Sequence, residues 1–297
     1  MKKVLGKKVG ILFLALVFVV LLAVPVFASE GGIPQVVRDA RQGVVRIVVY
    51  ASDGNSYIGT GFAIGEGKEV YIVTNHHVIE DAEEIYILYD TGKYVEAEIE
   101  VDEPVHDLCI LNPKRRIPDI VVLPLHGDDV ESGIAVYALG FPGTADQMGA
   151  QIKGDEVTID SSKDAITMTN GVISAIRESY IFGDGSAKVK AIQTNTSISG
   201  GNSGGPLLDS SGKVVGINTM GFTDGSNING CVHVSELRKL LKKNKIDFIT
   251  GDETITAETS KSIEWVPIIL IAVAVISLLL AIVVQVASGK KKANGQF

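Results

Sequence analysis

The chain has 297 residues and a mean hydropathy of +0.27, which is high for a soluble protein because long apolar runs lie at both ends. Its formal net charge is −8. Seven lysines flank the apolar ends, so the body between them holds 20 basic residues against 35 acidic ones. A body this acidic argues against nucleic acid as a partner, since phosphate contacts need a basic surface.

The first 28 residues have the pattern of a secretory signal peptide. Four lysines in "MKKVLGKKVG" precede the apolar run "ILFLALVFVVLLAV". Small residues, Val26 and Ala28, then stand three and one positions before Ser29. This order predicts a signal peptide over residues 1–28, cleaved after Ala28. The alternative is an uncleaved anchor helix over Val9 to Ala28, which is almost long enough to cross a bilayer.

The second apolar run, 266–287, contains 22 residues and no charge. At about 1.5 Å per residue a helix of this length spans about 33 Å, enough for the hydrocarbon core of a membrane. Trp265 precedes the run and "GKKK" follows it, so the basic tail, 288–297, is expected in the cytoplasm. The sequence therefore predicts a single-pass protein of the cell membrane whose body is extracytoplasmic and joined to the membrane by a polar tether, 247–265.

The central domain, 29–246, is predicted to be all-β. Short β-branched runs with Gly, Asp and Asn between them indicate two sets of six strands, about 100 residues in each set. A linker, 112–133, separates the sets. It begins with "NPKRRIPD", a Pro-rich break with basic residues that suits a crossing connection. We expect two six-stranded antiparallel barrels, one over about 36–111 and the other over about 134–246.

Three further features of the central domain carry predictions. The polar, Gly-rich segment 143–164 is expected to be a long surface loop with a short hairpin through "EVTID". A C-terminal helix is expected in "VSELRKLLKKNK", capped by Ser235. Cys109 and Cys231 fall in different predicted barrels, which favours two separate buried thiols over a disulfide.

A possible catalytic set stands in three separate segments. In "GGNSGG", glycines surround Ser203 and leave the N–H groups of Gly201 and Ser203 free to point the same way. "TNHHV" places His77 after an apolar strand, and "HDLCIL" places Asp107 at the head of another. A serine hydroxyl becomes a nucleophile only with a base, a group that orients the base, and donors for the oxyanion. The chain order His77, Asp107, Ser203 is the one that a trypsin-like triad requires.

These segments resemble the signature motifs of trypsin-like serine endopeptidases, most closely those of the HtrA/Deg branch. The matching strings are "VTNHHVI", "HDLCIL" and "IQTNTSISGGNSGGPLLDSSGKVVGINT", with "GTGFAIG" and "GVISAI" as further matches. The resemblance covers about residues 36–241 and implies a chymotrypsin-like fold acting on polypeptides without a metal or cofactor. It implies His77 as general base, Asp107 as its orienting carboxylate, Ser203 as nucleophile, and the Gly201 and Ser203 amides as the oxyanion hole. His76 is the rival base, but the family histidine directly precedes the valine.

The resemblance also suggests which residues bind substrate. Where trypsins carry a pocket aspartate, six residues before the nucleophile, this chain has Ser197, followed by Ile198. A pocket without charge disfavours basic residues and predicts cleavage after small or medium apolar ones. The segment "GINTM", and in it Ile217, Asn218 and Thr219, is expected to pair with an extended substrate backbone.

The chain departs from the family in two respects. HtrA-type proteins usually carry a PDZ domain after the protease, whereas here the tether and the apolar run follow. Asn202 stands where digestive trypsins have Asp, so an ion pair with a new N-terminal ammonium is not expected. Trimers are common in the family, and a homo-oligomer is an open expectation here.

Three other functions fit the sequence less well. "GNSGG" also fits the nucleophile elbow of α/β-hydrolases, but that fold needs a helix directly after the serine, where Pro206 and a strand pattern follow. A catalytically silent module that binds extended peptides is the main alternative. A metal site from His76, His77, His106 and Asp107 is disfavoured, because adjacent residues of a strand point to opposite faces.

Overall fold

The computed structural model describes residues 33–251 except 53, 68, 128, 144–150, 154–155, 159, 180–183 and 222–227. The chain divides into two units, Met1–Glu253 and Thr254–Phe297, and every described residue lies in the first. The predicted signal peptide, the apolar run 266–287, the basic tail and the tether beyond Gly251 are outside the described residues. No helix in the described part of the chain is long and apolar enough to span a bilayer.

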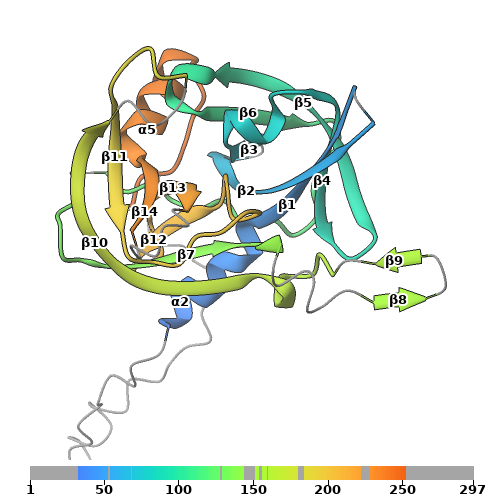
Figure 1. Ribbon diagram of the computed structural model, residues 1–297, viewed down its shortest axis with the longest axis horizontal. Helices are drawn as coiled ribbons and strands as arrows, with labels where there is room; N and C mark the ends of the chain where they lie inside the picture. The colour runs from blue at the N-terminus through green and yellow to red at the C-terminus, as the bar shows by residue number, and fades with distance from the viewer. Residues whose placement is uncertain are drawn as a thin grey trace, which may run out of the picture. The chain divides into compact units, whose positions relative to one another are not determined.

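Barrel one confirms the first predicted set of strands. Its strands close in the order β1-β2-β3-β6-β5-β4, with every neighbouring pair antiparallel (Figure 1). Every second residue of β1 from Val45 to Val49 belongs to the hydrophobic core of this barrel, since successive side chains of a strand point to opposite faces. The strands are β1 Val44–Ala51, β2 Ser56–Glu66, β3 Glu69–Thr74, β4 Ala82–Asp90, β5 Lys93–Glu103 and β6 Leu108–Pro113.

Barrel two closes in the order β10-β11-β14-β13-β12-β7 and is also antiparallel throughout (Figure 1). Its core contains Ile173, Ile192 and Leu207 from three of the strands. The predicted fold, two six-stranded antiparallel barrels, is therefore confirmed. The strands are β7 Ala135–Gly140, β10 Thr167–Ser179, β11 Val189–Thr194, β12 Pro206–Asp209, β13 Val214–Gly221 and β14 Asn229–His233.

The helical segments are short, and one cap was predicted wrongly. The C-terminal helix α5 Val234–Lys243 is present, but its N-cap is His233, whose Nδ1 accepts the N–H of Ser235 at 3.0 Å. Ser235 is thus inside the helix, because the neutral imidazole supplies the acceptor that a serine hydroxyl would have supplied. The other helical segments are α2 Gln35–Asp39, η1 Ala40–Gly43, α3 His76–Ile79, η2 Pro104–His106 and η3 Lys163–Ala165.

One hydrophobic cluster joins the two barrels. It includes Phe62 and Leu108 from barrel one, Leu139 and Val232 from barrel two, and Leu237 from α5, all fully buried. Such a shared core fixes how the barrels meet, since sliding one against the other would expose apolar surface. The two buried cysteines, in β6 and β14, are free thiols, as predicted.

The segment 143–164 contains the predicted hairpin, formed by β8 Gln151–Lys153 and β9 Glu156–Thr158, which projects away from the barrels in Figure 1. After the hairpin, the chain returns along barrel one. Arg46, 1% exposed on β1, donates to the Asp160 carbonyl at 3.0 Å, and Lys163 donates to the Val44 carbonyl at 2.7 Å. The insertion of barrel two is therefore anchored on barrel one.

Candidate active site

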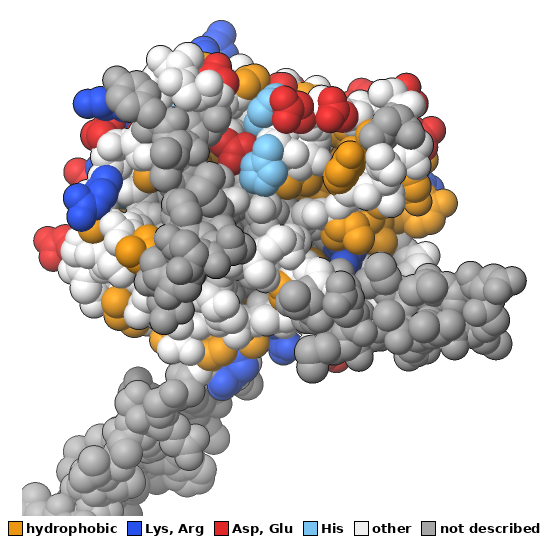
Figure 2. All heavy atoms as spheres, viewed as in Figure 1, with side chains coloured by type: hydrophobic (Ala, Val, Ile, Leu, Met, Phe, Trp, Pro, Cys, Tyr) orange, Lys and Arg blue, Asp and Glu red, His pale blue; other side chains and the backbone are white. Residues whose placement is uncertain are grey.

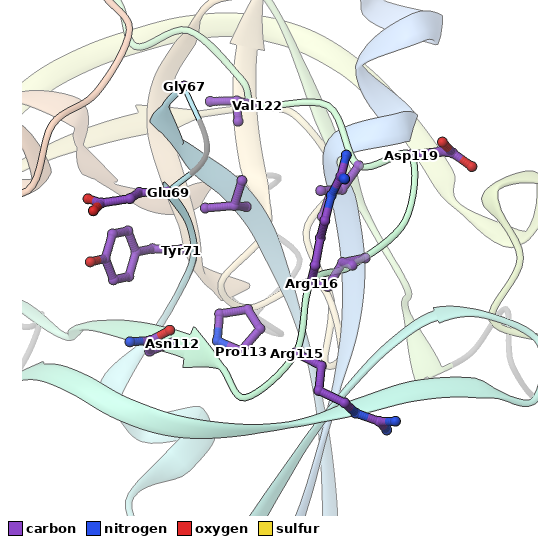
Figure 3. Close-up of a pocket in the computed structure, with 12 residues that line it drawn as sticks. Gly67, Glu69, Tyr71, Asn112, Pro113, Arg115, Arg116, Asp119 and Val122 are labelled. Carbon is purple, nitrogen blue, oxygen red and sulfur yellow. The ribbon is translucent and has the colours of Figure 1, made fainter.

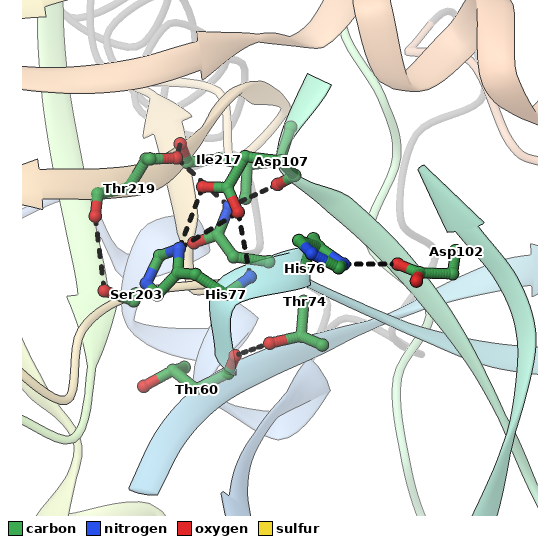
Figure 4. A network of polar contacts seen from close by, with 10 residues as sticks. Thr60, Thr74, His76, His77, Asp102, Asp107, Ser203, Ile217 and Thr219 are labelled. Atoms are coloured by element: carbon green, nitrogen blue, oxygen red, sulfur yellow. Dashed lines mark hydrogen bonds and ion pairs between the residues drawn. The ribbon is translucent and has the colours of Figure 1, made fainter. Parts of the chain in front are cut away.

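His77 and Asp107 form a close pair at the end of barrel one that faces barrel two (Figure 4). His77 Nδ1 lies 3.0 Å from Oδ1 and 2.9 Å from Oδ2 of Asp107. The His77 backbone N–H also donates to Asp107 Oδ1 at 3.0 Å. The His77 side chain is 44% exposed and that of Asp107 is 5% exposed. A buried carboxylate thus orients an accessible imidazole, and a proton on Nδ1 leaves Nε2 as the acceptor.

Asn75 fixes the backbone of Asp107 through a hydrogen bond. The Asn75 amide, fully buried, donates to the Asp107 backbone carbonyl at 2.8 Å and to Thr219 Oγ1 at 3.1 Å. Asp107 has a φ of 52°, in the left-handed region that Asp tolerates better than most side chains. The hydrogen bond from Asn75 therefore stabilises an uncommon backbone conformation that turns the carboxylate toward His77. It also links barrel one to β13 of barrel two.

Ser203 lies in the loop before β12, next to barrel one. Its backbone carbonyl accepts from the Thr60 N–H of β2 at 2.8 Å, and its hydroxyl donates to the Thr219 carbonyl at 3.3 Å. In Figure 4 the His77 ring lies between the Asp107 carboxylate and Ser203. A 3.3 Å bond is long for a hydroxyl donor, so rotation of the hydroxyl toward His77 costs little. Hydrogen bonds through Asn75 and Thr219 connect Asp107 with Ser203.

The loop before Ser203 presents two N–H groups. The four carbonyls from Gly200 to Ser203 all accept hydrogen bonds; in chain order the donors are Gly143 N–H at 2.8 Å, Thr60 Oγ1 at 2.6 Å, Gly205 N–H at 3.0 Å and Thr60 N–H at 2.8 Å. In a planar trans peptide the N–H points opposite to the carbonyl. The N–H groups of Gly201 and Ser203 thus point away from these contacts, and neither has an acceptor within the described residues. They are placed to bind an oxyanion.

Glycines in this loop are a geometric necessity. Gly201 has a φ of 97°, and a Cβ there would lie 2.3 Å from the Phe141 carbonyl oxygen. Gly204 has a φ of 85°, and a Cβ there would lie 2.2 Å from the Thr60 carbonyl oxygen. Both contacts are with backbone, so a side chain could not be accommodated by a rotamer change. The Gly-rich sequence thus brings the Ser203 loop directly against its neighbours.

The other histidines of the region have other partners. His76 and His77 begin the short helix α3, so the expectation that both lie on a strand was wrong, but their side chains still diverge. His76 Nδ1 lies 2.7 Å from Asp102 Oδ1, away from Asp107 (Figure 4). His106 lies between Glu103 and Glu236, at 3.7 and 3.6 Å. Figure 2 shows histidine side chains beside acidic ones on this face.

The predicted substrate-binding residues are only partly accessible. Ser197 is exposed, whereas Ile198 is buried. Ile217 and Asn218 are fully buried, and β13 pairs there with β14 on one side and with Pro206 and Gly205 on the other. Both sides of the strand are occupied at these two positions, so the predicted open edge was placed too early.

The open edge begins one residue later. The pairing of β13 with β14 shifts register between Asn218 and Met220, and the Thr219 carbonyl turns to the Ser203 hydroxyl. From Thr219 to Gly221, β13 has no strand partner on its Ser203 side among the described residues. An extended peptide bound there would lie beside the nucleophile.

A cavity of about 670 Å³ lies at the opposite end of β3, beside the linker (Figure 3). Its described lining includes Glu69, Tyr71 and Arg116, but no histidine, serine or cysteine. β3 runs from this cavity at Glu69 to Thr74, where the histidine segment begins. Because none of His77, Asp107 and Ser203 lines the cavity, it is not the site of the triad residues.

Sequence reasoning missed two residues of the site. Asn75 is part of "TNHHV" and Thr60 is part of "GTGFAIG", but neither string assigns a role to these residues. Both contact residues more than 30 positions away, at Asp107, Gly201 and Thr219. Local patterns carry no signal for such pairs. The sequence offers one hint to each role: Thr60 stands between two glycines, and Asn75 directly precedes the histidines.

Comparison with known proteins agrees with this geometry. Residues 59–217, just over half of the chain, match the trypsin-like peptidase domain family. Bovine mitochondrial serine protease HTRA2 (Bos taurus) is 32% identical over 201 residues, covering 66% of this chain and 39% of the relative. The serine protease Do-like HtrA of Lactobacillus helveticus is 31% identical over 188 residues, covering 59% and 41%. The chain thus spans about two fifths of the length of these relatives.

Solved structures show the same fold. A serine endoprotease from Yersinia pestis has 29% identity and a TM-score of 0.53, covering 71% of this chain and 65% of that one. The active form of the Rv3671c protease from M. tuberculosis has 22% identity and a TM-score of 0.57, covering 78% and 92%; this match speaks for the fold alone.

The fold and the arranged side chains define a trypsin-like peptidase domain, and the chain belongs to that family. Its curated relatives include proteases named HtrA, DegP-like and DegS, which supports an HtrA-type serine endopeptidase.

Proposed function

We propose that the protein is a serine endopeptidase that cleaves extended or unfolded polypeptides through an acyl-enzyme, with His77, Asp107 and Ser203 as its catalytic residues. One observation carries the proposal: the segments that contain His77, Asp107 and Ser203 are far apart in the sequence and lie next to one another in the structure. A buried carboxylate contacts an exposed imidazole, and the Ser203 loop beside them has two N–H groups without an acceptor in the described structure. This combination is the one that acyl transfer requires.

In the first step the Ser203 hydroxyl turns from the Thr219 carbonyl to His77 Nε2. Its oxygen bonds to the scissile carbonyl carbon while its proton passes to His77. The carbonyl oxygen becomes an anion, which the Gly201 and Ser203 N–H groups stabilise. Asp107 stabilises the imidazolium that forms, because its carboxylate faces Nδ1.

The intermediate then collapses and the C–N bond breaks. The proton on His77 passes to the leaving amine, which leaves as the new N-terminus of the released peptide. Water next gives a proton to His77 and adds to the acyl carbon, and Ser203 leaves with that proton. Apart from the substrate and one water molecule, these steps use side chains and backbone amides of this chain.

Substrate binding is proposed at the open edge Thr219–Gly221, with Ser197 at the mouth of the pocket for the residue before the cleaved bond. Ser197 is exposed and uncharged, and buried Ile198 follows it. These neighbours support cleavage after small or medium apolar residues, since a lysine side chain would find no carboxylate partner.

We further propose that the enzyme acts on the outer side of the cell membrane. The support is the sequence alone: the signal-peptide pattern over 1–28 and the uncharged run 266–287 followed by lysines. Besides polypeptide substrates, we propose a second copy of the chain as a partner, in a homo-oligomer. A measurement of the molecular mass of the detergent-solubilised full chain tests this.

The test of the catalytic proposal uses Ser203→Ala and His77→Ala in the full chain. A fluorophosphonate probe should label wild type, as Ser203 Oγ bonds to phosphorus and fluoride leaves. Both variants should lose labelling, and Ser203→Ala should cut peptide hydrolysis by about 10⁴-fold or more. His76→Ala is the matched control, because its side chain pairs with Asp102, and it should keep labelling. Undiminished cleavage by Ser203→Ala would disprove the mechanism.

A silent peptide-binding protein on the same fold is the alternative function. It predicts binding of extended peptides without labelling or cleavage by wild type. The same experiment therefore distinguishes the two.

A further inference from the structure

Thr60 lies where the two barrels meet and makes four hydrogen bonds with other segments. It is on β2 of barrel one and fully buried. Its N–H donates to the Ser203 carbonyl at 2.8 Å, and its hydroxyl donates to the Gly201 carbonyl at 2.6 Å. The hydroxyl also accepts the Phe141 N–H at 3.0 Å, and the Thr60 carbonyl accepts the Thr74 hydroxyl at 2.8 Å (Figure 4).

The direction of the Thr60 hydroxyl is fully determined by its neighbours. A carbonyl can only accept, so the single hydroxyl proton must point at the Gly201 oxygen. The Phe141 N–H can only donate, so it takes a lone pair of the same oxygen. One hydroxyl thus bridges the end of β7 and the loop before Ser203, and it has no freedom to rotate.

The surroundings fit this side chain closely. A Cβ at Gly140 would lie 2.9 Å from Thr60 Oγ1, and a Cβ at Gly205 would lie 3.0 Å from Thr60 Cγ2. Both distances are tighter than side chains normally tolerate. Thr60 is thus one of the neighbours that restrict these positions to glycine, beside Asn202 Oδ1 at 2.6 Å from the first and the Leu139 carbonyl oxygen at 2.3 Å from the second. Its hydroxyl and its methyl group are both closely surrounded.

The Gly201–Asn202 peptide is held on both sides: the Gly201 carbonyl accepts the Thr60 hydroxyl at 2.6 Å, and the Asn202 N–H donates to the Ser199 carbonyl at 3.0 Å. In the run Gly200 to Ser203, the Gly201 carbonyl is the only one bonded by a side chain, since the other three accept backbone N–H groups. Gly201 also has no Cβ and a φ of 97°, so its own sterics resist rotation weakly. If the carbonyl rotated toward another donor, the Gly201 N–H and the Ser203 N–H would no longer converge.

We infer that Thr60 is a positioning residue for the oxyanion hole: its hydroxyl holds the Gly201–Asn202 peptide, and its N–H holds the peptide after Ser203. The inference rests on the proposed function. It ties the hole, built by barrel two, to β2 of barrel one. Thr60 does not touch the reacting atoms, and acts only through the loop.

Two pairs of variants test the role of the hydroxyl. Thr60→Val keeps the shape and removes the hydroxyl, whereas Thr60→Ser keeps the hydroxyl and removes the methyl. Thr60→Ala and Thr60→Ser differ in the hydroxyl alone, and this comparison serves if the valine variant does not fold. Thr194→Val is the matched control for kcat, because Thr194 is equally buried and its hydroxyl contacts the Val172 carbonyl and the Thr196 hydroxyl, both at 2.8 Å, and not the segment Gly200 to Ser203.

The expected result is a loss in kcat without a loss in substrate binding. Thr60→Val should lower kcat about 10- to 100-fold, less than deletion of a donor of the hole, with KM changed less than threefold. A peptide aldehyde should bind more weakly by a similar factor. When Ser203 Oγ bonds to the aldehyde carbon and its proton moves to His77, the carbonyl oxygen becomes the anion that the hole must hold. Thr60→Ser should stay within about fivefold of wild type.

Several outcomes would overturn the inference. These are a kcat for Thr60→Val within threefold of wild type, a serine variant as slow as the alanine variant, or equal losses in Thr60→Val and Thr194→Val. If wild type itself neither cleaves peptides nor binds the aldehyde, the proposed function fails instead. The two failures are therefore distinguishable.

Discussion

At the residue scale, Asn75 offers a test that needs no activity. Its amide is the donor for the buried Asp107 carbonyl and for Thr219 Oγ1. Asn75→Ala leaves both acceptors without that donor, so the free energy of unfolding should fall by about 1–3 kcal/mol. Asn112→Ala, whose exposed amide donates to Glu100 at 3.0 Å, should change it by less than about 0.5 kcal/mol. Denaturant unfolding measures both, and equal effects would contradict the role of Asn75.

Single residues of the site were predictable only where a motif names them. His77, Asp107 and Ser203 stand in strings whose order carries information, and the structure brings these strings together. Asn75 and Thr60 were not assigned because their partners are distant in sequence. The substrate edge was misplaced at Ile217 and Asn218, since a single sequence does not show which side of a strand another strand already occupies.

At the element scale, the strands were predictable because period-two burial and Gly or Asp punctuation survive in the sequence. β5, for example, alternates exposed and buried residues through Val95 and Ala97. The short helical segments were not predictable from the sequence, because a single helical turn has too few residues to show a periodic pattern. The cap of α5 was also missed, since Ser235 is the usual capping residue and His233 is not.

The α5 cap predicts a pH dependence of stability. Burial, and then the nearby Lys190 charge, lower the pKa of His233 to about 4, against about 6.5 in an unfolded chain. The unfolded state therefore binds the extra proton first as pH falls. The contribution of neutral His233 is complete above pH 6.5 and is lost progressively toward pH 4, with about 2 kcal/mol lost between pH 7 and 5.

The measurement is Tm at pH 7 and pH 5. His233→Asn keeps a capping acceptor but does not titrate in this range, so its Tm should fall less than that of wild type over the same interval. Equal falls in the two proteins would contradict the prediction, because groups other than His233 would then carry the whole effect.

At the scale of the whole molecule, the joining of the barrels is what creates the site. His77 and Asp107 come from barrel one, Ser203 from barrel two, and the core that unites them includes residues of both. Neither barrel contains the full set. Which barrel faces meet was not predictable from period or composition, because the shared cluster consists of ordinary apolar residues such as Phe62 and Leu139 that any core would use.

The shared core predicts that the barrels unfold together. Cys109 of β6 and Cys231 of β14 are fully buried, one in each barrel, and burial raises the pKa of both thiols. Neither should react with a thiol reagent in the native state. As guanidinium increases, both should become reactive at the same concentration, because exposing one barrel would uncover the common apolar cluster. Mass spectrometry of the labelled peptides separates the two sites, and labelling of Cys109 while Cys231 stays protected would mean that the barrels unfold independently.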